Sequence, residues 1–75
     1  MKGARTGLAE HLANRLKAER EARGWTQAEL AARVGVSRKT INTIENGVFV
    51  PSTITALKIA GAFGLSVEQL FSIER

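Results

Sequence analysis

Residues 26–47 read TQAELAARVGVSRKTINTIENG, and this stretch decides the fold because it specifies two short helices joined by a glycine turn. Thr26 is suited to cap the first helix, and Glu29 completes a capping box three residues later. Gly35 follows the last apolar residue, where a helix commonly ends on a residue with positive φ. Ser37 is then expected to cap the second helix.

The second helix, which is predicted to end at Gly47, has one apolar side and one polar side. At roughly 100° per residue, Ile41 and Ile44 share one arc with Thr40. The side chains of the opposite arc all donate hydrogen bonds, and they are Arg38, Lys39, Asn42, Thr43 and Asn46. A solvated face usually mixes charges of both signs, so this acid-free face is unusual. The alternative is an ordinary surface helix of a small bundle, which the turn glycine and the two caps disfavour.

Several pieces of the chain match a known pattern: Gln27-Ala28-Glu29-Leu30-Ala31, Gly35-Val36-Ser37, Ile44-Glu45-Asn46-Gly47, Pro51, Leu57, Ala60 and Leu70-Phe71. With these pieces the chain resembles the helix-turn-helix domain of the phage Cro and repressor type, also called the XRE family, over about residues 12–72. The resemblance implies an all-α fold, a compact five-helix bundle of the lambda-repressor-like type, in which helices 2 and 3 form the helix-turn-helix. It also implies a sequence-specific transcriptional regulator, expected to be a repressor, whose second motif helix enters the major groove of double-stranded DNA.

The resemblance implies base contacts for residues on the polar arc of the second motif helix. Arg38 is the first candidate, because arginine bound to guanine O6 and N7 is the commonest specific contact. Lys39 and Thr43 are further candidates, and Asn42 is the fourth. Relatives in the family often carry glutamine where Lys39 stands, so their target sequence cannot be transferred to this chain.

Other motif positions are expected to hold the DNA backbone or the fold. Gln27, Ser37 and Asn46 are expected at phosphates, and their alternative roles are helix caps and turn hydrogen bonds. Arg20 and Glu45 are expected to form a structural ion pair, with a phosphate contact as the second possible role of Arg20.

Apolar spacing predicts the remaining helices. A first helix is expected over Leu8–Arg23, because Leu8, Leu12 and Leu16 repeat every four residues. Another is expected over residues 53–63, and a short terminal helix over residues 67–71. The expected buried residues of the helix over 53–63 are Ile54, Ala56, Leu57, Ala60 and Phe63.

Residues 1–7 are expected to form a mobile N-terminal arm, either touching DNA or simply a disordered end, and residues 8–75 a single helix-turn-helix domain. A homodimer on a palindromic operator is expected, because one such module buries only about 600–1,000 Å² on DNA. The candidate interface residues in the C-terminal region are Phe49, Leu70, Phe71 and Ile73. The apolar loop Val48-Phe49-Val50 either folds onto the core or lies at a partner interface.

Composition limits the other possible functions. The 75 residues are 44% hydrophobic and carry a net charge of +4, and the basic residues concentrate in residues 1–39. This half ends in the second motif helix, which suits a polyanionic partner. The chain has no cysteine, no aspartate and one histidine, His11, so neither a metal site nor a cofactor is expected. It has no nucleophile–base arrangement and no phosphate-binding glycine loop, so an enzyme is not expected.

No apolar run approaches the roughly 20 residues that span a membrane, and MKGARTG is not followed by an apolar segment. Neither a membrane segment nor a signal peptide is therefore expected, and the expected location is the cytoplasm, at the nucleoid. Two alternative functions stay open. One is an antitoxin or a restriction-modification controller with the same fold and a toxin or other protein partner. The other is a protein-interaction adaptor that does not read DNA.

Overall fold

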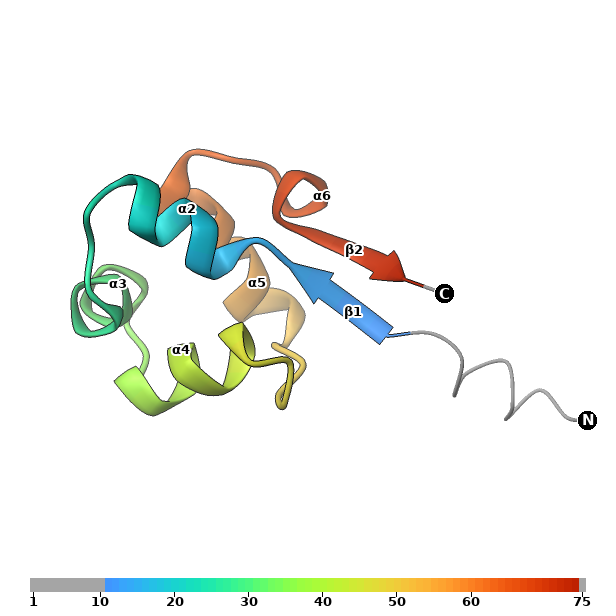
Figure 1. The fold of residues 1–75 in the computed structure, drawn as a ribbon, viewed down its shortest axis with the longest axis horizontal. Coiled ribbons are helices and arrows are strands. Elements are labelled where there is room, and N and C mark those ends of the chain that lie inside the picture. The colour runs from blue at the N-terminus through green and yellow to red at the C-terminus, as the bar shows by residue number, and fades with distance from the viewer. Residues whose placement is uncertain (1–10, 75) are drawn as a thin grey trace, which may run out of the picture.

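The computed structural model describes residues 11–74, so the expected N-terminal arm over residues 1–7 lies outside the described part of the chain. The elements follow one another as β1 (His11–Asn14), α2 (Leu16–Ala22), α3 (Gln27–Val34), α4 (Arg38–Glu45), α5 (Thr53–Phe63), α6 (Val67–Leu70) and β2 (Phe71–Glu74). Five short helices enclose the core, and the two strands extend from one side of it (Figure 1).

The motif helices α3 and α4 begin and end through local contacts. Thr26 Oγ1 accepts a hydrogen bond from the Glu29 N–H at 3.0 Å, and Glu29 Oε1 accepts one from the Thr26 N–H at 2.7 Å. Gly35 then ends α3 with φ of 84°, and Ser37 Oγ accepts from the first turn of α4. The predicted capping box, turn glycine and second cap are thus confirmed, and they hold the two helices at a fixed turn.

All five helices contribute to one hydrophobic core. Its largest fully buried side chains are Leu16, Leu30, Ile41, Ile44, Ile59 and Leu70. The prediction for α5 was partly wrong, because Ile54 and Leu57 are 66% and 58% exposed. Ile59, which the prediction did not name, is fully buried in their place. The apolar residues of α5 surround most of the helix, so spacing did not reveal which side faces the core.

The long first helix predicted over Leu8–Arg23 was wrong. Within the described part, residues 11–14 form strand β1 and the helix begins only at Leu16. A spacing of four residues places leucines on one face of a helix, but it also places them on one face of a strand. The strand forms because Leu12 has a cross-strand partner, Ile73, which lies 61 positions later in the chain.

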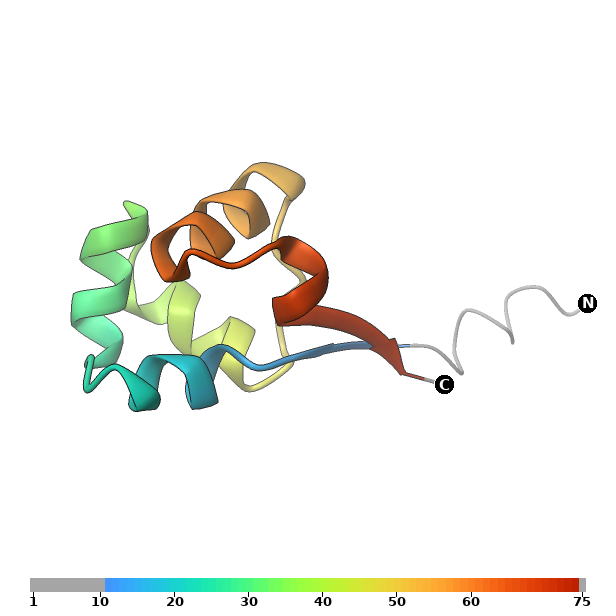
Figure 2. The ribbon, with the colours of Figure 1, turned by 90° about the horizontal axis from the view of Figure 1, so that it is seen from above.

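The two strands form a small antiparallel sheet, so the fold is not strictly all-α as predicted. His11 pairs with Glu74 and Asn14 with Phe71, which brings the start and the end of the described chain side by side. Figure 2 shows this two-stranded ribbon extending away from the helices. A two-stranded sheet alone is marginally stable in water, so its base depends on the packing of Phe71 in the core.

The apolar residues proposed for a partner interface divide into two groups. Leu70 and Phe71 are only 1% and 7% exposed, so their prediction as interface residues was wrong: they complete the monomer's own core. Phe49 and Ile73 are exposed, and the loop that contains Phe49 does not fold onto the core.

Residues 11–74 contain neither a membrane-spanning helix nor a cluster of potential metal ligands. The described helices include none that is long and apolar enough to cross a membrane. The same residues contain no group of three potential metal ligands.

Candidate nucleic-acid interface

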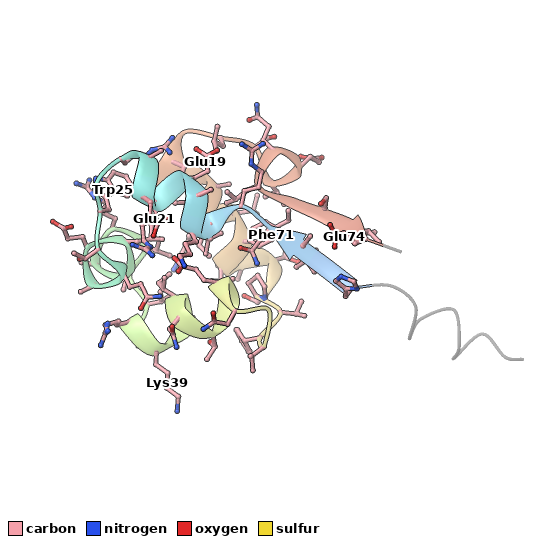
Figure 3. All side chains as sticks on the ribbon, in the orientation of Figure 1. Glu19, Glu21, Trp25, Lys39, Phe71 and Glu74 are labelled. Atoms are coloured by element: carbon pink, nitrogen blue, oxygen red, sulfur yellow. The ribbon has the colours of Figure 1, made fainter. Side chains whose placement is uncertain are left out.

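Helix α4 presents its polar arc to solvent and buries its apolar arc. Ile41 and Ile44 are fully buried, whereas Arg38, Lys39 and Asn42 are exposed. Figure 3 shows the Lys39 side chain pointing away from the helical body. The structure therefore brings these three predicted base-contact residues to the outer face of one helix, where another molecule can reach them.

The charges at the start of α4 oppose the preference of an isolated helix. Its first turn contains Arg38 and Lys39 and no acidic residue. The N-terminal end of a helix carries partial positive charge, so cations there are disfavoured by about 0.3–1 kcal/mol at an exposed site. Since the fold gains nothing from this arrangement, the excess positive charge is best explained by an anion that binds outside the protein.

A shallow depression of about 300 Å³ connects the two motif helices on this face. It is lined by Gln27 at the start of α3 and by Arg38, Lys39 and Asn42 of α4. Thr43 is not part of it and lines the neighbouring hollow near Phe49. The Thr43 hydroxyl lies 3.0 Å from the carbonyl oxygens of Lys39 and Thr40, to which it donates, so it has no proton left for a base.

The three residues predicted to contact phosphate all make contacts inside the protein. Ser37 caps α4, with its Oγ 3.1 Å from the Thr40 nitrogen. Asn46 is the last cap of α4 and donates from its side chain to Asn42 Oδ1 at 3.2 Å. Gln27 donates from Nε2 to Asn42 Oδ1. The cap roles expected as alternatives are therefore present for Ser37 and Asn46, whereas Gln27 links α3 to α4 and forms neither a cap nor a turn hydrogen bond. Phosphate contacts would have to be added to these contacts.

Arg20 and Glu45 form an ion pair that attaches α2 to α4 behind the exposed face. Arg20 donates from Nε to Glu45 Oε2 at 2.7 Å and from Nη2 to Glu45 Oε1 at 3.2 Å. The side chains are 11% and 2% exposed, and the hydrogen bond to Glu45 raises the pKa of Arg20 above its ordinary value. Arg20 also donates to the Trp25 carbonyl. The Arg20 guanidinium therefore forms its hydrogen bonds within the protein, to Glu45 and to the Trp25 carbonyl.

Asn14 links the ribbon to α4, although no sequence pattern indicated this residue. Its Nδ2 donates to the Ile44 carbonyl at 3.0 Å, and its Oδ1 accepts from the Leu16 N–H at 3.1 Å. One amide therefore satisfies the first N–H of α2 and a carbonyl in the last turn of α4. The first contact joins residues 30 positions apart, so no local pattern in the sequence could have indicated it.

Two helices with a tight glycine turn, the second of which carries an exposed basic face, define the class of helix-turn-helix DNA-binding proteins. The helix-turn-helix family pattern matches residues 16–70. The chain belongs to this family, the XRE-type DNA-binding transcription regulators.

Similar proteins come from bacteria and archaea. The uncharacterized HTH-type transcriptional regulator YgzD of Bacillus subtilis is 43% identical over 61 residues, which cover 81% of this chain and 92% of YgzD. An uncharacterized HTH-type transcriptional regulator of Methanocaldococcus jannaschii is 46% identical with the same coverage of both chains. The antitoxin HipB of Escherichia coli O6:H1 is 41% identical over 56 residues, or 75% of this chain and 60% of the antitoxin.

Proposed function

We propose that this regulator is a repressor that binds a palindromic operator as a homodimer, with α4 in the major groove of each half-site. The observation that carries the proposal is the acid-free outer face of α4, where exposed Arg38 and Lys39 accompany exposed Asn42. Such a face is unfavourable for the free helix and complementary to DNA. A dimer bound across a promoter would exclude the transcription machinery, and it would act in the cytoplasm, where bacterial and archaeal DNA lies.

Each exposed group has a distinct role in this proposal. Arg38 binds guanine through O6 and N7, and Lys39 binds guanine or a nearby phosphate as a point charge. Asn42 contacts a base edge, and Thr43 makes a contact that does not require its hydroxyl proton. The N-terminal ends of α3 and α4 approach phosphates, where Ser37 and Asn46 add contacts to their present ones. Gln27 binds a phosphate through its backbone N–H at the start of α3, because both hydrogens of its side-chain NH₂ group are used within the protein.

The proposed second copy binds at the ribbon. The Arg15 N–H donates to the Leu70 carbonyl at 3.0 Å, next to the paired residues of the sheet. Because hydrogen-bonded and non-hydrogen-bonded pairs alternate, the N–H and C=O of Leu12 and Ile73 face the two outer edges. An antiparallel pair formed by one strand and its own copy has two-fold symmetry, which matches a palindromic operator.

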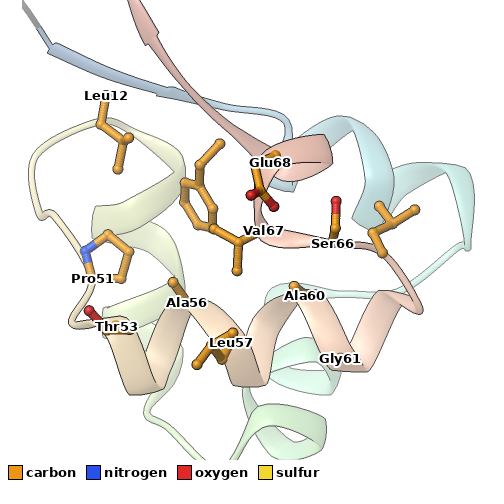
Figure 4. A pocket seen from close by; sticks show the side chains of 12 residues that line it. Leu12, Pro51, Thr53, Ala56, Leu57, Ala60, Gly61, Ser66, Val67 and Glu68 are labelled. Atoms are coloured by element: carbon orange, nitrogen blue, oxygen red, sulfur yellow. The ribbon is translucent and has the colours of Figure 1, made fainter.

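An apolar groove beside the ribbon supports the same interface. It has a volume of about 670 Å³, and Leu12, Pro51 and Leu57 are among the residues that line it between the ribbon and α5 (Figure 4). The large apolar side chains that are exposed in residues 11–74 lie in the ribbon, in α5 and in the loop before it, and they are Val48, Phe49, Val50, Ile54, Leu57 and Ile73. A monomeric protein rarely exposes so many in a chain this short, and a second copy would cover them.

The test is selection from a random duplex pool, followed by titration of the enriched sequence with wild-type protein and with Arg38→Ala. We expect a two-fold palindrome, and we expect Arg38→Ala to cost about 1–3 kcal/mol of binding free energy and to relax one position in each half-site. If no sequence is enriched, and binding is weak and steeply dependent on salt, the regulator proposal is wrong.

The relatives named antitoxin HipB favour one second candidate, an antitoxin that binds DNA through the same face. In that case the gene beside this one would encode a toxin. Expression of the neighbouring gene alone would arrest growth, and co-expression with this chain would restore it. Normal growth on expression of each neighbouring gene alone would exclude this candidate.

A further inference from the structure

We propose that Asn42 reads DNA only as a hydrogen-bond donor, because a chain of contacts that begins at the Arg20–Glu45 ion pair fixes the orientation of its amide. Asn42 would therefore select guanine or thymine, the bases with a keto oxygen in the major groove, over adenine and cytosine. The inference rests on the proposed function, since it concerns what the same helix recognises.

The chain of contacts begins at the Glu45 carboxylate, which can only accept hydrogen bonds. Arg20 donates to both carboxylate oxygens, at 2.7 and 3.2 Å, and the Glu45 side chain is only 2% exposed. The amide group of Gln27 that lies 3.0 Å from Glu45 Oε1 must therefore be the NH₂ group, because a carbonyl oxygen there would face a carboxylate oxygen.

The orientation of the Gln27 amide in turn fixes the orientation of the Asn42 amide. The same Gln27 Nε2 lies 3.2 Å from the Asn42 side chain, so the atom that Asn42 directs at it must be its oxygen. Asn46 lies on the other side, and its Nδ2 is 3.2 Å from the same Asn42 Oδ1. A carbonyl oxygen has two lone pairs, and both are now occupied.

The group of Asn42 that remains for DNA is its NH₂ group. Its Nδ2 group has two hydrogens with no partner among the described residues, and Asn42 is exposed beside Arg38 and Lys39. A free asparagine binds adenine through both its oxygen and its nitrogen, but this oxygen is already used. Guanine presents O6 and N7 as acceptors and thymine presents O4. Adenine presents N7 as its one acceptor, beside an amino group that would face the Asn42 NH₂, and cytosine presents only an amino group.

This preference leaves a specific pattern in an operator. Every base pair has one keto base and one amino base, so a keto reader accepts two of the four base pairs, those with guanine or thymine on the same strand. Readout of a purine N7 would instead accept guanine and adenine on one strand, and bidentate readout of adenine would accept one base pair only.

The experiment uses the operator obtained by selection and begins with Asn42→Ala, which marks the base pair that Asn42 faces. The affinity of wild-type protein is then measured for all four base pairs at this position. We expect the two pairs with the keto base on one strand to bind about tenfold more tightly than the other two. Gln27→Met keeps the length of the side chain and removes its hydrogen bonds, so the Asn42 amide can rotate and the preference falls to about twofold or less.

Ser37→Ala is the control, because it removes a proposed phosphate contact and a cap without touching the amides. It should weaken binding to all four base pairs by the same factor. The inference is wrong if Asn42→Ala relaxes no position, if the wild-type preference does not follow the keto pattern, or if Gln27→Met weakens all four pairs equally. If no operator is enriched at all, the proposed function itself fails.

A measurement without DNA tests the network separately. In an NMR experiment on the free protein, the side-chain NH₂ hydrogens of Gln27 should exchange with water at least tenfold more slowly than those of Asn42. Equal exchange rates would contradict the fixed orientation whatever the protein does with DNA.

Discussion

Arg20 and Glu45, separated by 25 positions in the chain, join α2 to α4 through two hydrogen bonds of 2.7 and 3.2 Å. The pair lies directly behind the face that α4 presents to solvent. It therefore supports both the fold and the proposed recognition surface, and its removal should affect the two together.

Glu45→Ala should lower the free energy of unfolding by about 3 kcal/mol, because Arg20 would remain as a buried cation without its partner. Urea unfolding measures this loss. The exposed Glu68 is the control, since Glu68→Ala should change stability by no more than about 0.5 kcal/mol. The double variant Arg20→Met, Glu45→Leu should lose less than the two single changes combined. Additive losses would show that the two side chains are not coupled.

Two glycines should respond in opposite ways to alanine. Gly35 has φ of 84°, so Gly35→Ala should cost about 1 kcal/mol of stability through backbone strain, although a Cβ there meets no described atom within 4 Å. Gly61 lies inside α5 with equally open space, so Gly61→Ala should gain about 0.5–1 kcal/mol. Urea unfolding of both variants gives the comparison. A loss of stability in Gly61→Ala would contradict the helical environment described for that residue.

Acid should weaken the capping box of α3. The backbone N–H of Thr26 donates to Glu29 and lowers the pKa of this carboxyl below its ordinary value of 4.5. A group with a lowered folded-state pKa stabilises the protein above its unfolded-state pKa, and the contribution is lost as pH falls through the folded-state value. Thermal unfolding of wild type and Glu29→Gln should thus give a constant difference above about pH 6 that shrinks below pH 4.5. A difference independent of pH would show that ionisation of Glu29 does not contribute.

Ile73→Asp should produce a monomer, because it places a charge in the proposed interface at a side chain that is 62% exposed. Sedimentation measures the mass of the protein in solution. Ser72→Asp is the matched control: Ser72 is also exposed but lies on the opposite face of the ribbon, so its variant should remain dimeric. If Ile73→Asp sediments as a dimer with unchanged affinity, the ribbon is not the interface.

The motif and α5 could be predicted from the sequence because their signals are local. Thr26, Ser37 and Ser52 cap helices through contacts three residues away, and the structure begins the three helices after these residues. The ribbon could not be predicted in this way. The four-residue spacing of the leucines fits a helix and a strand equally well, and only pairing with the far end of the chain decides between them.

The proposed site also has features that the sequence predicted and features that it did not. The sequence identified the side chains that α4 exposes, because helical periodicity separates them from Ile41 and Ile44. Their roles toward bases and phosphates remain predictions. The sequence did not reveal that Thr43 uses its hydroxyl proton within the helix, because that depends on the side-chain rotamer.

By itself the sequence determined two capped helices, the glycine turn between them and the acid-free polar face of the second, since each depends on residues a few positions apart. Only the tertiary structure decided where the ribbon forms, that Leu70 and Phe71 belong to the core, and which way the Asn42 amide points. These features depend on contacts between residues distant in the chain. The fold must first bring such residues together before hydrogen bonding and burial can select one arrangement.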